Sequence, residues 1–281
     1  MRYRTYHRTT YVYGEQVSRC HNQVHLTPRS GPQQTVTAFH LDVSPRPEAV
    51  VSHTDYFGNT VHFFCIHEAH GRLEVVAEAL VDVTEKSAPD LSSSPAWESA
   101  REQTREHVDA YQFVFDSTFV RTGDEFRAYA EPSFSPGRPL LDAANELCGR
   151  IYAGFRYQPY TTQIDTPVET ALRNRRGVCQ DFAQVMIAGL RSMGISARYV
   201  SGYIRSGQDR VGAEASHAWV SVFCPRFGWT DFDPTNNRMV LGADHVTLAW
   251  GRDYADVTPV KGVIVGGGEH LVHVSVGVVP A

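Results

Sequence analysis

Hydrophobic and polar residues alternate with a period of two in the first third of the chain. Threonine, valine, tyrosine and phenylalanine alternate with polar residues at 5–13, 34–43 and 60–66. Turn-forming residues at 28–32 and 57–59 separate these segments. Several short strands joined by regular turns are typical of an antiparallel sandwich or barrel. We therefore expect an all-β region at the N-terminus.

The spacing of apolar residues changes after a Pro-rich connector at 132–139. Apolar side chains then recur at intervals of three and four between 140 and 155, which predicts a helix with one buried face. A second helix is expected from Cys179 to Met193, with Gly194 at its C-terminal stop. We place the domain boundary in the connector. Residues 1–135 then form a β-rich domain and residues 136–281 form a second domain.

Two further segments show helix signals. Residues 97–111 follow a Ser- and Pro-rich loop and carry Glu and Arg at helical spacings, which predicts a short solvated helix. The sequence Thr-Pro-Val-Glu at 166–169 predicts another helix start. Thr166 is expected to cap it, and Glu169 to close a capping box.

Strand signals return in the last third of the chain, at 197–204, 217–224, 229–233 and 270–279. Residues 262–268 predict a turn, and we interpret the glycine run 266–268 as a hairpin turn. Because helices come first and antiparallel strands follow, the fold class is expected to be α+β.

Composition narrows the possible partners. The chain has 281 residues, a formal net charge of -5 and a pI of about 6.2. This balance argues against a general nucleic-acid binder, which needs a basic patch or stripe. No apolar stretch is long enough to span a membrane, and the N-terminus lacks the apolar run of a signal peptide. We expect neither a nucleic-acid nor a membrane partner.

The five cysteines are odd in number and form no CxxC pair. A disulfide framework is therefore not expected, and the reducing cytoplasm is the expected location.

Cys179 lies at the start of a predicted helix, after Gly177 and Val178. Free backbone N–H groups and the positive end of the helix dipole favour a thiolate at that place. The alternative is a structural cysteine, because free cysteines are commonly buried as small hydrophobes.

His217 opens a predicted strand and is a candidate base for the proton of Cys179. The alternative is a core histidine packed beside Trp219. An acid on the next strand would fix the imidazole tautomer. Period two puts Asp231 and Asp233 on one face, so spacing does not choose between them.

Three motifs in this order resemble the core motifs of the transglutaminase-like superfamily. They are GVCQDFA at 177–183, SHAWV at 216–220 and GWTDFDPTN at 228–236. The chain is more specifically similar to the bacterial branch with a β-sandwich N-terminal domain. That likeness runs nearly from end to end, with further matches at 11–13, 25–29, 55–59 and 251–257.

The resemblance implies a papain-like core, in which the helix that begins at Cys179 packs on an antiparallel sheet or small barrel. It also favours Asp233 over Asp231 as the acid of a Cys179–His217–Asp233 triad. We carry over no calcium site, because the chain has no EF-hand loop. No cofactor and no metal are predicted.

A cluster of possible metal ligands occurs at His62, Cys65, His67 and His70. On a strand, His62 faces opposite to Cys65 and His67, so the four side chains would not converge. We do not expect a metal site there.

Together these features predict a thiol-dependent enzyme that performs acyl transfer on a peptide or amide substrate. Hydrolysis by a cysteine peptidase or amidase is the expected outcome, because the sequence shows no dedicated amine site. Trp219 and Trp229 are candidate aromatic walls for such a site, although packing is the simpler role for both. A protein-glutamine transglutaminase is the alternative. A non-catalytic binding or scaffold module is a third possibility, against which the complete Cys/His/Asp set argues.

Overall fold

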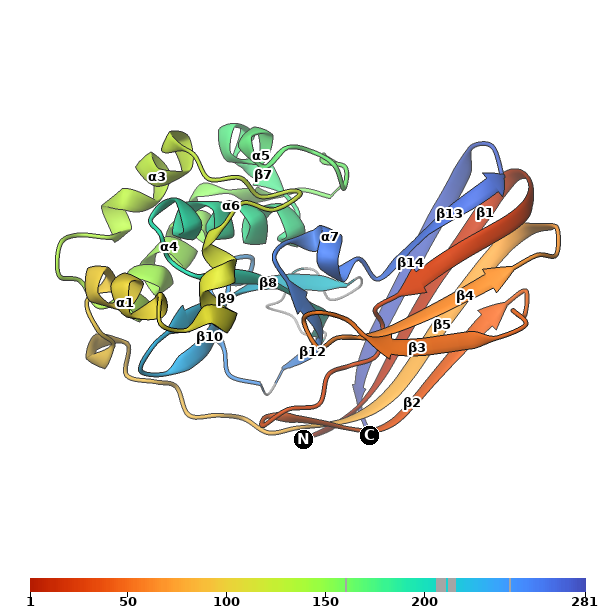
Figure 1. The fold of residues 1–281 in the computed structure, drawn as a ribbon, viewed down its shortest axis with the longest axis horizontal. Helices are drawn as coiled ribbons and strands as arrows, with labels where there is room; N and C mark the ends of the chain where they lie inside the picture. Colours follow the sequence, from red (N-terminus) through yellow and green to blue (C-terminus); the bar gives the residue numbers. More distant parts are fainter. Residues whose placement is uncertain (160, 206–210, 212–215, 243) are drawn as a thin grey trace.

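Seven strands form one curved sheet that holds both ends of the chain (Figure 1). The computed structural model describes residues 1–159, 161–205, 211, 216–242 and 244–281. The expected all-β region is confirmed, as a single connected sheet that we call the sheet lobe. Its strands are β1 (Arg2–Val24), β2 (Gln34–Ser44), β3 (Val50–Thr54), β4 (Thr60–Ile66), β5 (His70–Val83), β13 (Val260–Gly266) and β14 (His270–Pro280).

Strand β1 is the centre of this sheet, because most of its residues pair with strands on both sides. β5 and β4 pair with successive parts of it, and so do β14 and β13, all antiparallel to it. The hairpin predicted at 266–268 is therefore wrong, as is the turn predicted at 262–268. β13 and β14 run in the same direction along β1, and the glycines form the irregular link between them. Gly266, Gly267 and Gly268 have φ of 92°, 91° and 58°, a region that disfavours other residues.

The rest of the chain, residues 91–257, is called the core lobe. Its main sheet has five antiparallel strands in the order β11-β10-β9-β8-β12. These are β8 (Ala197–Ile204), β9 (His217–Cys224), β10 (Gly228–Asp233), β11 (Arg238–Val240) and β12 (His245–Gly251). A small parallel pair is formed by β6 (Arg156–Tyr157) and β7 (Arg176–Gly177). The expected α+β class is confirmed.

Helices cover one side of the core sheet (Figure 1). Among the described residues, no helix has both the length and the apolar character required to span a bilayer. The helices are α1 (Trp97–Thr104), α2 (Val108–Tyr111), α3 (Asp124–Ala130), α4 (Leu140–Gly154), α5 (Val168–Asn174), α6 (Cys179–Ser192) and α7 (Tyr254–Val257), with 3-10 turns η1 (Leu91–Ser93), η2 (Gln112–Val114) and η3 (Glu131–Ser133).

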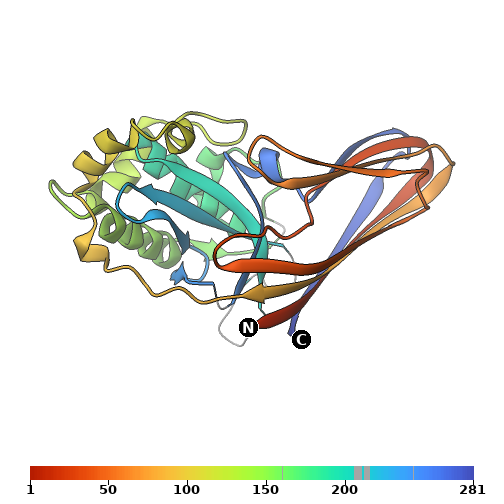
Figure 2. The ribbon, with the colours of Figure 1, turned by 60° about the horizontal axis from the view of Figure 1, so that its bottom comes forward.

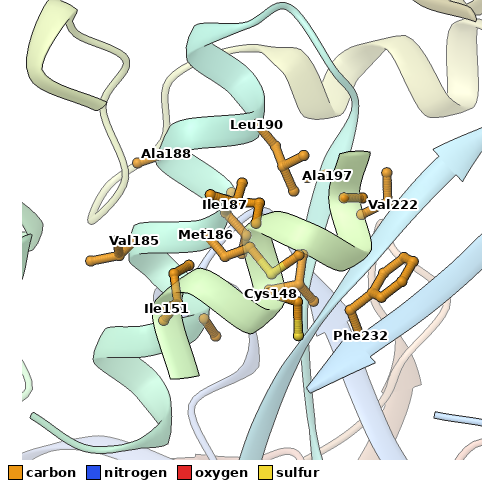
Figure 3. Packing of buried hydrophobic residues seen from close by; sticks show 14 of the residues in the cluster. Cys148, Ile151, Val185, Met186, Ile187, Ala188, Leu190, Ala197, Val222 and Phe232 are labelled. Carbon is orange, nitrogen blue, oxygen red and sulfur yellow. The ribbon is translucent and has the colours of Figure 1, made fainter. Parts of the chain in front are cut away.

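The centre of the core lobe lies between α4, α6 and the sheet (Figure 3). Cys148 and Ile151 of α4 meet Met186 of α6, with Val222 and Phe232 of the sheet beside them, and all five are fully buried. Burial of this kind stabilises the fold by roughly 1.5–3 kcal/mol for each large apolar side chain. It fixes α6, and with it the position of the residue that begins that helix.

Two predicted helix ends have different outcomes. Gly194 follows α6 with a φ of 78°, as the sequence predicts. The cap predicted at Thr166 is wrong. Pro167 occupies the N-cap of α5, no side chain caps that helix, and the Thr166 hydroxyl instead accepts a hydrogen bond from the Gln163 N–H at 2.8 Å.

The two lobes meet along β12 (Figure 2). The side-chain amide of Gln34 pairs with the backbone of Thr247 through two hydrogen bonds of 2.8 Å. Tyr203, Val246 and Leu248 of the core sheet are buried in the apolar cluster of the sheet lobe. The lobes are thus joined by a shared core and by strand-like hydrogen bonds.

The domain boundary at 132–139 stays a prediction. Packing in the structure links segments on both sides of that boundary. Ala100 of α1 and Phe126 of α3 are buried in the same cluster as α4 and α6, and the last two strands pair with β1.

Gly202 of β8 lies where no side chain fits. A Cβ there would be 2.2 Å from the Val246 carbonyl oxygen and 2.4 Å from the Trp219 ring. We expect Gly202→Ala to lower the free energy of unfolding by about 1–3 kcal/mol, because the core must shift to admit it. The control is Gly277→Ala in β14, where nothing lies within 4 Å of the added atom. Urea denaturation of both variants measures the difference, and equal midpoints would contradict the steric argument.

Candidate active site

The start of α6 is built to hold Cys179 at the first helical position. Asp181 accepts hydrogen bonds from the Val178 N–H and the Thr162 hydroxyl, both at 2.7 Å. Valine has no side-chain acceptor, so the amides of the first turn receive no side-chain cap from it. Gly177 is required beside this carboxylate, because a Cβ there would lie 2.3 Å from Asp181 Oδ2. Among the described residues, no side chain caps the first-turn N–H groups of the helix that Cys179 begins.

The thiol of Cys179 is 7% exposed, and its Sγ lies 3.9 Å from the Ser216 carbonyl oxygen. Tyr157, Tyr199 and Tyr254 belong to, or pack against, the buried cluster that contains Cys179. Burial raises the pKa of all three hydroxyls, and the nearby Cys179 adds to the effect. These tyrosines remain protonated at neutral pH.

His217 and Asp233 form a buried pair at the ends of β9 and β10. His217 Nε2 lies 2.8 Å from Asp233 Oδ2, and both side chains are fully buried. The carboxylate also accepts hydrogen bonds from the Asn236 side chain at 2.8 Å and from the Thr235 N–H at 2.9 Å. His217 Nδ1 has no hydrogen-bond partner among the described residues. The acid thus holds Nε2, and Nδ1 is the ring nitrogen left for Cys179, whose interaction with the ring raises the pKa of His217.

The charges of this pair support each other. Burial disfavours the imidazolium, but the charge and hydrogen bond of Asp233 outweigh it and raise the pKa of His217, with Cys179 acting in the same direction. Burial alone would raise the pKa of Asp233, yet His217 and then His245 hold it well below its usual value. A protonated imidazole beside an ionised carboxylate is the result.

Asp231, which spacing alone did not distinguish from Asp233, has another partner. Its Oδ2 accepts a hydrogen bond from Trp219 Nε1 at 3.1 Å. Trp219 is fully buried, and its ring centre lies 6.2 Å from that of His217. The tryptophan therefore packs beside the imidazole, and Asp231 holds the tryptophan.

Two residues at the site escaped the sequence reasoning. Asn236 binds Asp233 through both its N–H and its side chain, at 3.2 and 2.8 Å, and the Asp-Pro-Thr-Asn turn was an available signal for the first contact. His245 is 4% exposed, and its Nε2 lies 3.5 Å from Asp233 Oδ2. Burial lowers the pKa of His245, although Asp233 opposes this. His245 begins β12, a segment for which the sequence predicted no strand, so nothing in the sequence placed this histidine at the site.

The possible ligand atoms of His217, Asp233 and His245 lie within 4.8 Å of one another, which is close enough for the three residues to bind one metal ion. The 2.8 Å from His217 Nε2 to Asp233 Oδ2 is shorter than the separation of about 3.3 Å expected between ligands of a tetrahedral zinc site. Both histidines point to one carboxylate oxygen. The arrangement is that of a hydrogen-bonded acid.

Of His62, Cys65, His67 and His70, Cys65 and His67 share the neighbour His21, and the other two have separate partners. Cys65 Sγ lies 2.9 Å from His21 Nδ1, and His70 Nδ1 lies 2.7 Å from the Glu68 carbonyl oxygen. His62 Nδ1 lies 3.4 Å from a threonine hydroxyl. These side chains do not face a common point.

Comparison with known proteins places these features in a family. Residues 3–82 match the bacterial transglutaminase-like N-terminal region, and residues 127–234 match the transglutaminase-like superfamily. An uncharacterized protein of Mycobacterium tuberculosis is 39% identical over 99% of this chain and 93% of its own length. The protein-glutamine gamma-glutamyltransferase of Pseudomonas aeruginosa is 31% identical over 40% of this chain and 17% of its own length.

A solved structure shares the whole fold. The crystal structure described as that of a candidate cysteine protease from Cytophaga hutchinsonii matches with a TM-score of 0.74 and 21% identity, over 100% of this chain and 91% of that one. The matched regions span both lobes in the order seen here. The chain therefore belongs to the transglutaminase-like superfamily and carries the bacterial transglutaminase-like N-terminal region ahead of its core.

Proposed function

We propose that this protein is a thiol-dependent acyl-transfer enzyme acting on amide or peptide bonds, with hydrolysis as its main outcome. Cys179 is the nucleophile, His217 the base and Asp233 the orienting acid. The observation that carries the proposal is the buried His217–Asp233 pair, joined at 2.8 Å through Nε2, which leaves Nδ1 of the imidazole for Cys179. The thiol of Cys179 is close enough to contribute to the raised pKa of that imidazole.

In the proposed reaction His217 first gives up a proton and later takes one back, while Cys179 first forms a thioester and is then released from it. The Cys179 thiolate adds to the amide carbonyl carbon, and the first-turn amides of α6 stabilise the oxyanion. His217 Nδ1–H then protonates the departing amine, which leaves a thioester on Cys179. Water attacks the thioester while Nδ1 takes its proton, and the acid product leaves with the thiolate restored. Asp233 holds Nε2 throughout and stabilises the imidazolium.

Hydrolysis is favoured over transfer to an amine, because neither tryptophan forms an amine channel. Trp219 is buried beneath His217. Trp229 lies against Phe113 and Phe223, with the Arg198 guanidinium over its ring at 4.0 Å. Transamidation remains the second candidate because one relative is named as a protein-glutamine gamma-glutamyltransferase.

A peptide or amide is the proposed substrate, and the cytoplasm the proposed place of action. All five cysteines are free thiols, which suits a reducing compartment.

The test is a product analysis with glutamine-containing peptides and an excess of labelled primary amine. Mass spectrometry is expected to show free acid exceeding amine adduct in the wild-type protein, and neither with Cys179→Ala.

Two other results of this product analysis would change the proposed function. More adduct than free acid would replace hydrolysis by transamidation. If no peptide yields a Cys179-dependent product and Cys179 is not alkylated faster than the other thiols, the non-catalytic scaffold is the better description.

A further inference from the structure

A cavity of about 300 Å³ lies where the two lobes meet. One wall is the segment 29–34, which connects β1 to β2, and the other is formed by β8, β10 and β12. Arg198 points to this side because side chains alternate along β8, and its neighbours Ala197 and Tyr199 are buried in the helix-covered cluster. The cavity is therefore on the face of the core sheet opposite to α6.

Arg198 is the unusual feature of this cavity. The side chain lines it and is only 8% exposed. Its guanidinium carbon lies 4.0 Å from the ring centre of Trp229 and 3.7 Å from that of Trp250. Among the described residues, none accepts a hydrogen bond from it, and its buried Nε has no partner. A buried cation without an acceptor is unfavourable, which is also why burial lowers its pKa.

The other charged side chains that line the cavity are also mostly positive. Arg29 and Lys86 also line the cavity, whereas Asp231 is its single acid among the described lining residues. Arg29 lies over the Trp250 ring at 3.5 Å, and its Nε is buried without a partner. Asp231 forms no ion pair with Arg198 and is hydrogen-bonded to Trp219 instead. Three cations and one carboxylate thus line the cavity, and of these cations Arg29 also donates to the Asn59 side chain and the Phe57 carbonyl, which lie outside the lining.

We propose that this cavity binds a small anion bearing a carboxylate or phosphate group, with Arg198 as its main contact. The guanidinium offers a planar set of N–H donors that matches either group in a bidentate way. The two tryptophan rings hold the plane of the guanidinium, so little side-chain freedom is lost on binding. The cavity volume is at the lower end of the range for small-molecule sites.

The position of the cavity connects it to the candidate active site. His245 lines the cavity, and its Nε2 lies 3.5 Å from Asp233 Oδ2. A bound anion would therefore lie one side chain away from the acid of the proposed triad. The binding itself does not depend on that triad, so Cys179→Ala is expected to bind the anion as the wild type does.

The test is a titration of the wild-type protein with inorganic phosphate and, separately, with succinate. Calorimetry and thermal denaturation are measured against sodium chloride of matched ionic strength. We expect saturable binding of at least one anion, and a rise in Tm of about 3–6 °C at ten times the dissociation constant. Binding of phosphate but not succinate would identify the site as one for phosphate groups, and the reverse would identify it as one for carboxylates.

Two arginine variants give the control. Arg198→Gln is expected to fold, because it removes an uncompensated buried charge, and to lose the anion response. Arg101→Gln should keep the full response, since Arg101 also lies over a tryptophan but outside the cavity, with Glu102 as its ion-pair partner. No saturable binding by the wild type, or an unchanged response in Arg198→Gln, would overturn the proposal. If Arg198→Gln does not fold, Arg198→Lys decides: weakened binding supports the site, and unchanged binding rejects it.

Discussion

Replacing Cys179 by alanine is expected to abolish turnover, with a loss in kcat on the order of 10⁵–10⁶-fold. The thiol is the only group at the start of α6 able to form the thioester, so no other side chain can substitute for it. The fold should be retained, because alanine favours a helix and the change removes only one atom from the buried cluster to which Cys179 belongs. Steady-state assays with a cleaved peptide, together with a thermal denaturation curve, check both parts.

Cys65 provides a matched control for this variant. Its Sγ also lies beside an imidazole, 2.9 Å from His21 Nδ1, but on the sheet lobe, where no acid among the described residues binds that ring. Cys65→Ala should leave kcat unchanged. Iodoacetamide labelling with peptide mapping should show Cys179 reacting faster than Cys65 near neutral pH. Equal labelling of the two, with Cys179 shown to be accessible, would remove Cys179 from the nucleophile role.

Asp233→Asn is expected to lower kcat by about 10²–10⁴-fold. The amide cannot stabilise an imidazolium, and its NH₂ group can turn toward the donors that now bind the carboxylate. His217 then loses both its fixed tautomer and the source of its raised pKa. The measurement is kcat against pH for the folded variant, with near-UV circular dichroism to confirm that the buried aromatic packing is retained.

Asp231→Asn is the paired control, since it makes the same chemical change two residues away. An amide oxygen at 231 can still accept the Trp219 hydrogen bond. We expect kcat within about tenfold of the wild type. A larger loss for Asp231→Asn than for Asp233→Asn would exchange the roles of the two acids.

Elements with strong local periodicity were predictable from the sequence. The segment from Cys179 to Gly194 combines an apolar helical face with a glycine stop, and the structure has α6 there. β8 and β9 begin and end at the predicted residues, because alternating β-branched and aromatic residues leave few other choices. The motifs that flank these elements led to the correct family.

Long-range pairing was not predictable in the same way. The pattern at 270–279 predicts a strand, but nothing local says that it pairs with Thr5–Tyr13 rather than with the core sheet. β12 carries the polar residues His245 and Thr247, which serve the site and the lobe contact, so its sequence gave little strand signal. His245 and the Arg198 cavity both depend on β12, which explains why neither appeared in the sequence reasoning.

The return of β13 and β14 to β1 has a consequence during synthesis of the chain. β1 leaves the ribosome before the core lobe, and its last partners, β13 and β14, emerge only after the whole core lobe has been made. At translation rates of about 5–20 residues per second, one edge of the longest strand stays unpaired for roughly 10–50 s. An open edge of this kind readily pairs with other chains. The sheet lobe can therefore complete its folding only after the core lobe has been made, and early folding of the core lobe would shorten the time for which that edge is open.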